Sequence, residues 1–338
     1  MDERVMEDRM VDLEYQDSRP PCSCGGLFVI FRKEMADHIH SRRFLLVLAL
    51  IGLTSIASIY GAVSGLGQEA GAGERGMNYL FLRLFTSGSG SVPSFMSLIA
   101  LLGPFVGLAL GFDAINREEA EGTLNRLAAQ PVYRDSIING KFLAGAVLIG
   151  IMVFSMGLFT GAAGLLVMGV PPVGEELGRI GVFLLFTCIY ICFWLALSIL
   201  FSVACRHTAT SVMLGIGCWI FFALFMSVVV RVLVDILCPQ DQMVTLGDLM
   251  DSYSLNLGLN RLSPYYLYSE AVSTIMNPSV RSTNIILPFQ MEGAVAGYLS
   301  LGQSLLLVWP HLTGLLAGGA VVFAVSYVWF MNREFRGR

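Results

Sequence analysis

The stretch NREEAEGTLNRLAAQPVYRDSIINGKF, residues 116–142, is a charged island between two long apolar runs. The whole chain has 338 residues, of which 55% are hydrophobic and only 14% are charged. That is more apolar side chain than the core of one soluble domain accommodates. The composition therefore predicts a membrane protein in which this island lies outside the lipid.

A helix needs roughly 20 apolar residues to cross about 30 Å of hydrocarbon. Six runs of this kind are present, at residues 44–65, 94–112, 142–168, 180–204, 209–230 and 305–330. We therefore expect an all-α, polytopic fold with one transmembrane domain over residues 44–331.

Basic residues near the span ends predict the orientation, because cytoplasmic loops carry an excess of lysine and arginine. They gather at residues 32–43, 117–141 and 333–338 and at Arg206, whereas on the other side they are spread thinly over longer loops. We therefore expect both termini and the charged island in the cytoplasm of a cell-membrane protein. No short apolar run with a cleavage site precedes the first span, so we expect no signal peptide.

An acidic tail at residues 1–26 and a basic tail at residues 332–338 lie outside the spans. Cys22 and Cys24 lack the further ligands of a recognisable metal site, so we expect a reduced, flexible tail, with copper or zinc binding as the alternative. The formal net charge is −4 and the basic residues are scattered, which gives no electrostatic footprint for nucleic acid. We expect neither a metal site nor a nucleic-acid partner.

Residues 116–130 have the features of a short amphipathic helix. Asn116 is a good N-cap, and Glu119 is placed to reach back to it in a capping box. Acidic residues fill the first turns and Arg126 lies in the last, which suits the helix dipole. Pro131 ends the helix, because the residue before a proline is driven away from helical angles.

Two interpretations of this helix are open on the residues alone. It either lies among lipid headgroups as a connector or docks a protein in the cytoplasm. Its acidic start suits an anionic leaflet poorly, and its apolar stripe is narrow for interfacial burial. Arg134 and Lys141 follow at a spacing that lets both point toward a partner or toward lipid phosphates.

Small residues recur at four-residue spacing within the spans, which predicts close helix packing. The pattern occurs in the second, third and sixth spans, at Gly103, Gly107 and Gly111, at Gly157 and Gly161, and at Gly314 and Gly318. Such faces support assembly and carry no information about cargo.

The segment at residues 232–303 is the longest interruption of the apolar pattern and is expected outside the cell. Ser263 is placed to cap a short helix that begins at Pro264, and Asn277 ends it after about three turns. Three tyrosines of this helix are expected at the outer headgroups: Tyr265, Tyr266 and Tyr268.

Other candidates for chemistry fail on spacing. His38 and His40 lie two apart and point to different sides of a helix, so they do not form a metal clamp. His311 is expected at the outer interface, with a functional intramembrane role as the alternative. Arg231 and Asp235 are spaced to pair on one face. Since no protease or lipase motif is present either, we expect no catalytic residue.

The island resembles the "E-x-x-x-G-T-L … L … P-x-x-R … G-K" signature in the first cytoplasmic loop of ABC-2 type transporter permeases. The residues that carry the resemblance are Glu118, Glu121, Gly122, Thr123, Leu124, Leu127, Pro131, Arg134, Gly140 and Lys141. Residues 27–43 are similar to the amphipathic helix that precedes the first span in these permeases, and the layout of six spans with a large outer segment also matches.

The resemblance implies a permease subunit that dimerises and works with two cytoplasmic ATPase subunits. Residues 116–130 would be the coupling helix, Arg206 would make a minor contact, and the tyrosines after Pro264 would lie near the cargo path. The sequence contains no G-x-x-x-x-G-K-[ST] loop, so ATP and Mg are expected on the partner and no cofactor on this chain.

Two classes of function follow. The first is the permease of an ATP-driven transporter, with export favoured by the family, moving cargo by alternating access. The second is a membrane scaffold or sensor that docks a cytoplasmic partner through the same loop without transport. The residues do not identify a cargo.

Overall fold

The computed structural model describes residues 23–69, 80–88, 93–123, 133–169, 171–239, 246–278 and 299–333. Within these ranges every regular element is a helix. Five helical segments are long and apolar enough to cross a membrane: Phe95–Ala120, Arg134–Leu166, Gly174–Ala204, Thr208–Leu237 and Leu301–Asn332. They confirm the all-helical, multi-span prediction. The first predicted span falls on α3 (Arg42–Glu69), which is not among these five, so the count of six stays a prediction.

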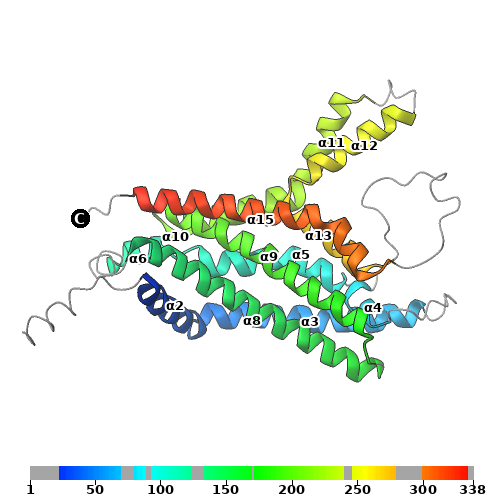
Figure 1. Cartoon of the computed structure of the whole chain (residues 1–338), viewed down its shortest axis with the longest axis horizontal. Coiled ribbons are helices and arrows are strands. Elements are labelled where there is room, and N and C mark those ends of the chain that lie inside the picture. Colours follow the sequence, from blue (N-terminus) through cyan, green and yellow to red (C-terminus); the bar gives the residue numbers. More distant parts are fainter. Residues whose placement is uncertain are drawn as a thin grey trace, which may run out of the picture.

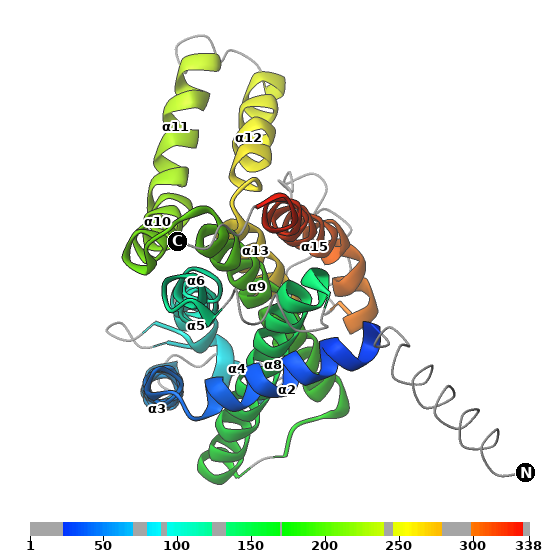
Figure 2. The ribbon, with the colours of Figure 1, turned by 90° about the vertical axis from the view of Figure 1, so that its left-hand side faces the viewer.

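The central helix of the bundle is α9 (Gly174–Ala204). It packs against α5 (Phe95–Gly111), α8 (Arg134–Met168), α13 (Pro264–Met276) and α15 (Leu301–Asn332) (Figures 1 and 2). Its largest side chains are fully buried: Phe183, Phe186, Tyr190 and Trp194. The core of the described chain is therefore organised around this one helix.

The two ends of the bundle differ. At one end, α2 (Ser23–Ile39) lies across the bundle near α6 (Asn116–Ala120) (Figure 2). We call this the α6 end. Helix α15 ends on the same side, whereas α4 (Leu80–Thr86) lies at the opposite end, which we call the α4 end (Figure 1).

A helical hairpin projects from the side of the bundle (Figure 1). Here α10 (Thr208–Ile220) runs through the π-helical turn Phe221–Phe225 into α11 (Met226–Leu237), and α12 (Leu246–Asn260) returns. A π-turn is a common cause of a bend, because it interrupts the regular hydrogen-bond ladder. The predicted fifth span is thus longer than residues 209–230 and is bent.

The α11 helix carries the residues that were spaced to pair on one face, Arg231 and Asp235. Both are exposed, and no ion pair joins them in the described part of the chain. The pairing prediction is therefore wrong.

Close packing between α5 and α9 depends on the glycines of the second predicted span. A Cβ atom added at Gly107 would lie 2.6 Å from the carbonyl oxygen of Ile191 and 2.8 Å from the amide nitrogen of Leu195. Gly103 and Gly111 also face α9 at short range. The prediction of a small-residue contact face is confirmed for this pair of helices.

A proline inside α5 is compensated from α9. Pro104 has no N–H, so the carbonyl of Ala100, one turn earlier, loses its usual donor. The hydroxyl of Tyr190 donates to that carbonyl at 2.9 Å. The Tyr190 ring stacks on Tyr268 with centroids 4.2 Å apart, and the Tyr268 hydroxyl lies 2.8 Å from Oγ1 of Thr187.

The start of α13 forms as the sequence predicts. Ser263 caps the helix by accepting from the amide of Tyr266, Pro264 is its first residue, and Asn277 follows its last. The hydroxyl of Ser263 also donates to the carbonyl of Phe222 in the π-turn at 2.9 Å. A single serine therefore orders both the helix start and the bend beside it.

The expected headgroup position of Tyr268 is wrong. Its side chain is fully buried, because its ring and hydroxyl both find partners on α9. Tyr265 and Tyr266 are half-buried.

A buried arginine holds the α4 end together. Arg179 of α9 is fully buried, donates to the carbonyls of Ile275 at 2.6 Å and Leu299 at 2.5 Å, and pairs with Glu175 at 3.0 Å. Its partners lie at the end of α13 and just before α15. Arg179 therefore joins α9 to the end of α13 and to the residues just before α15.

A methyl group at Gly107 should force α5 and α9 apart, because the nearest atoms are backbone and cannot rotate away. We expect Gly107→Ala to cost about 1–3 kcal/mol, as overpacking typically does. The measurement is the free energy of unfolding in mild detergent. Gly150→Ala is the matched control, since no atom lies within 4 Å of the added carbon, and equal losses in both variants would contradict the packing account.

Candidate functional site at the α6 end

The start of α6 is held by α9. The hydroxyl oxygen of Ser202 accepts from the amides of Ile115 at 2.9 Å and Asn116 at 3.2 Å. The Asn116 side chain instead donates to the carbonyl of Phe112. The predicted capping box of Asn116 and Glu119 is therefore wrong, because a serine distant in sequence supplies the acceptor.

The predicted helix at residues 116–130 is interrupted. Helix α6 ends at Ala120, and Gly122 follows with a left-handed φ of 69°. The hydroxyl of Thr123 folds back onto the carbonyl of Glu118 at 3.1 Å. The remainder of the predicted helix, with Leu124, Leu127 and Pro131, lies outside the described residues.

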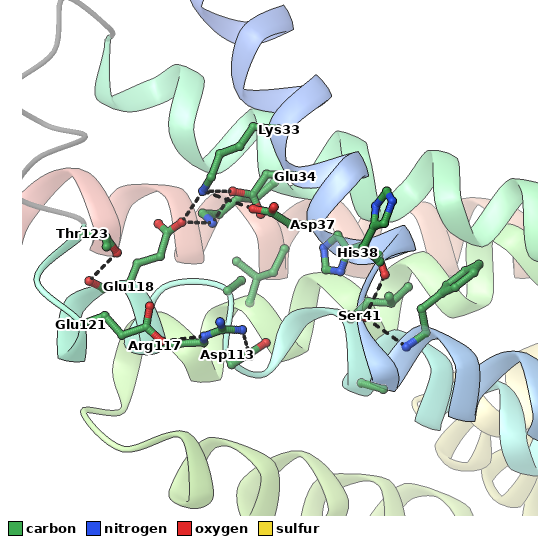
Figure 3. Close-up of a pocket in the computed structure, with 17 residues that line it drawn as sticks. Lys33, Glu34, Asp37, His38, Ser41, Asp113, Arg117, Glu118, Glu121 and Thr123 are labelled. Atoms are coloured by element: carbon green, nitrogen blue, oxygen red, sulfur yellow. Dashed lines mark hydrogen bonds and ion pairs between the residues drawn. The ribbon is translucent and has the colours of Figure 1, made fainter.

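Four charged side chains from three helices meet beside α6, and we call them the four-residue cluster: Lys33, Glu34, Glu118 and Lys141. Glu118 lies 2.9 Å from Lys33 and 3.0 Å from Lys141, while Glu34 lies 3.0 Å and 2.8 Å from the same two lysines (Figure 3). The cluster therefore ties α6 to α2 and α8 through alternating charges.

Lys141 does not point outward. Its side chain is only 4% exposed, and it contacts the carboxylates of Glu34 and Glu118. The expectation that Lys141 reaches a partner or lipid phosphates is wrong, because its ammonium group is paired with two largely buried carboxylates. Gly140 permits this arrangement, since a Cβ there would lie 2.8 Å from the side chain of Ile30 on α2.

The cluster shifts the pKa values of Lys33 and Glu34. Burial alone would raise the pKa of Glu34, but attraction to Lys141, and then to Lys33, lowers it. Burial would lower the pKa of Lys33, whereas the charge of Glu34 and the hydrogen bond to Glu118 raise it. Because the folded pKa of Glu34 is lowered, its stabilisation is present at neutral pH and is lost only as pH falls through that folded value.

A second tie joins α6 to the last helix. Arg333, which follows α15, lies 2.8 Å from Glu119 and donates to the carbonyl of Val203 at the end of α9 at 2.7 Å. Sequence reasoning placed Arg333 only among orienting charges and missed Glu34 and Ser202 entirely. The pairing of Lys33 with Glu34 next to it, on a helix expected to be amphipathic, was the one available signal.

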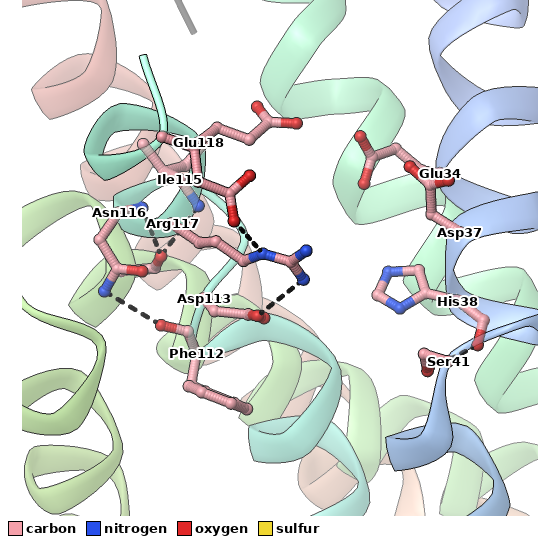
Figure 4. Close-up of polar contacts among 12 residues, drawn as sticks. Glu34, Asp37, His38, Ser41, Phe112, Asp113, Ile115, Asn116, Arg117 and Glu118 are labelled. Atoms are coloured by element: carbon pink, nitrogen blue, oxygen red, sulfur yellow. Dashed lines mark hydrogen bonds and ion pairs between the residues drawn. The ribbon is translucent and has the colours of Figure 1, made fainter. Parts of the chain in front are cut away.

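In the first turn of α6, Arg117 lies 2.9 Å from Glu121 (Figure 3) and 3.7 Å from Asp113 (Figure 4). The side chain of Glu121 is 53% exposed, so it is available to a partner while Glu118 is not. Arg134 is exposed at the first turn of α8, and Arg206 is exposed in the turn after α9. The structure therefore brings Glu118 and Lys141 into one cluster, and neither Arg134 nor Arg206 belongs to it.

The histidine expected at the interface is also a structural residue. His311 is 2% exposed, and its Nε2 lies 2.8 Å from Glu270, which accepts two hydrogen bonds from Arg261. No group of three or more metal-ligating side chains occurs within the described ranges.

Apolar helices long enough to cross a membrane, with charged side chains gathered at one end, define a multi-pass membrane protein. A family model described as "ABC-2 family transporter protein" matches residues 28–335, so the chain belongs to this family. The resemblance seen in the charged island is confirmed.

Two relatives carry the name "Probable ABC transporter permease protein NosY". The chain is 29% identical to that of Pseudomonas aeruginosa over 201 residues, which cover 59% of this chain and 67% of the relative. It is 28% identical to that of Stutzerimonas stutzeri over 205 residues, or 60% and 69% of the two chains.

Removing the cluster's buried lysine should be costly, because Glu34 and Glu118 would then share only Lys33. We expect Lys141→Met to destabilise the protein by about 3–5 kcal/mol, the usual range when one partner of a buried pair is lost. The free energy of unfolding in detergent measures this. Arg134→Met, on the same helix but exposed, should cost under about 1 kcal/mol, and equal losses would show that the cluster contributes no special stability.

Proposed function

We propose that this chain is the transmembrane permease subunit of an ATP-driven exporter. Two copies of a cytoplasmic ATPase bind ATP and Mg and dock at the α6 end, and the permease pairs with a second copy of itself. Both termini then lie in the cytoplasm, and this chain binds no cofactor. Membership of the ABC-2 family and the names of the two relatives support this assignment.

The single observation that carries the proposal is the set of contacts that joins α6, at the start of the loop, to four other segments. Glu118 binds α2 and α8, Glu119 binds Arg333 after α15, and Ser202 of α9 holds the first amides of α6. Stretching a partly buried ion pair is costly, since the separated charges are not fully resolvated by water. A push on the loop is therefore transmitted to several long helices together.

The same helices reach the other end of the bundle. Both α9 and α15 run from the α6 end to the α4 end (Figure 1), where Arg179 links α9 to the end of α13 and to the carbonyl of Leu299 before α15. A tilt imposed at the α6 end is therefore carried through α9 and Arg179 to α13, which bears Tyr265 and Tyr266. We assign alternating access to this tilt and place the cargo path beside these tyrosines.

The coupling role of the loop is tested by removing loop side chains that lie outside the four-residue cluster. Glu121→Ala combined with Leu124→Ala should lower ATPase binding or its stimulation by the permease by about tenfold, as loss of interface anchors does. The fold should persist, because exposed Glu121 lies outside the four-residue cluster. Co-purification from the native membrane and the rate of ATP hydrolysis in liposomes are the measurements.

The matched control is Leu249→Ala with Asp251→Ala, two exposed residues of α12 on the projecting hairpin. This control should leave complex and activity unchanged. An unaltered complex and unaltered hydrolysis in the loop variant would contradict coupling through this segment. A bound partner whose hydrolysis never depends on the permease would instead identify a scaffold or sensor.

A further inference from the structure

A cavity of about 640 Å³ lies at the α6 end between α2, the start of α3 and the junction of α5 with α6 (Figure 3). Five apolar residues line part of its wall: Phe44, Ala109, Leu110, Ala114 and Ile199. The remaining wall is almost entirely charged or polar. The cavity thus combines apolar and ionic walls within one enclosure.

The ionic wall carries both signs with an excess of acid. Three cations line it, namely Lys33, Arg117 and Lys141, against five carboxylates, namely Glu34, Asp37, Asp113, Glu118 and Glu121. Figure 4 shows Arg117 on one side of the gap, facing Asp37 and His38 on the other. A cavity of this kind suits a dipolar ligand with a cationic end.

One buried acceptor in this wall lacks a donor. The second oxygen of Glu118, Oε2, is buried and receives no hydrogen bond from the described residues. An unsatisfied buried acceptor destabilises the structure, and a bound donor would remove that cost. Asp37 is also lightly engaged, since its ionic contact with Lys33 is 3.7 Å long and its side chain is 63% exposed.

The surroundings favour a membrane lipid as the source of that donor. The adjacent helix α2 exposes Phe28, Val29 and Ile39, a pattern typical of a helix at the lipid surface. A phospholipid places its charged headgroup next to apolar chains, as the two walls of the cavity require. Arg117 faces the gap; its Nε donates to Glu121 and its Nη1 lies 3.7 Å from Asp113, and its planar guanidinium has the geometry that phosphate prefers.

We propose that this cavity binds the phosphoethanolamine headgroup of a phospholipid. The primary ammonium lies between Asp37, Asp113 and the free oxygen of Glu118, and the phosphate lies at Arg117. The site goes beyond the proposed export function, because it requires only that the α6 end lies at a membrane surface. A bound lipid would brace α2 against the root of α6.

The test compares lipids that differ only at the nitrogen. The full-length chain in detergent is titrated with phosphatidylethanolamine and phosphatidylcholine of equal chain length, and binding is measured by native mass spectrometry and by the unfolding midpoint. The ethanolamine lipid should bind at least about tenfold more tightly, because a trimethylated nitrogen has no N–H to donate. Asp37→Asn with Asp113→Asn should abolish that preference.

The control is Asp235→Asn with Asp251→Asn, which changes the net charge equally on the projecting hairpin and should keep the preference. Equal binding of the two lipids by the natural chain would overturn the proposal. If free phosphoethanolamine raised the unfolding midpoint as much as phosphatidylethanolamine does, the ligand would be the free headgroup and not a lipid. A variant at Asp37 and Asp113 that keeps its lipid preference but loses a co-purifying ATPase would assign the cavity to that partner.

Discussion

The ion pairs among Lys33, Glu34, Glu118 and Lys141 are the constraint on which the α6 end depends. Each lysine lies within 3.0 Å of both carboxylates, so neither α2, α6 nor α8 can shift alone without separating opposite charges. In a partly buried setting such separation is expensive, because water is not there to replace the lost partner. The cluster thus holds α2, α6 and α8 together as one unit.

This arrangement separates two roles within one short sequence. Glu118 and Lys141, which resemble the family signature, face inward and join helices. Glu121, one residue beyond α6, is 53% exposed and pairs with Arg117. In the proposed function, the partner contacts the exposed part of the loop, while Glu118 and Lys141 keep the start of the loop fixed to the bundle.

Local chemistry predicted much of the fold. Ser263 followed by Pro264 starts α13 as its residue types require, and the glycines of α5 contact α9 at backbone distance. The interruption at Gly122 also had a local signal, since glycine inside a helical pattern weakens it. The predictions that were wrong depended on residues distant in sequence. Ser202 accepts the hydrogen bonds expected for a cap at Asn116, and Tyr268 is buried because it stacks on Tyr190. Burial of Lys141 likewise required Glu34, which lies 107 positions away. No local spacing contains such information.

Distances between spin labels in the assembled transporter test the central claim most directly. One label pair replaces Ala120 of α6 and Arg134 of α8, both exposed, and a second reports the α4 end through Leu177 in each of two paired subunits. If α6 moves with α8, trapping ATP leaves the first distance unchanged and alters the second. A change between residues 120 and 134 with a fixed distance between the two copies of residue 177 would contradict the account.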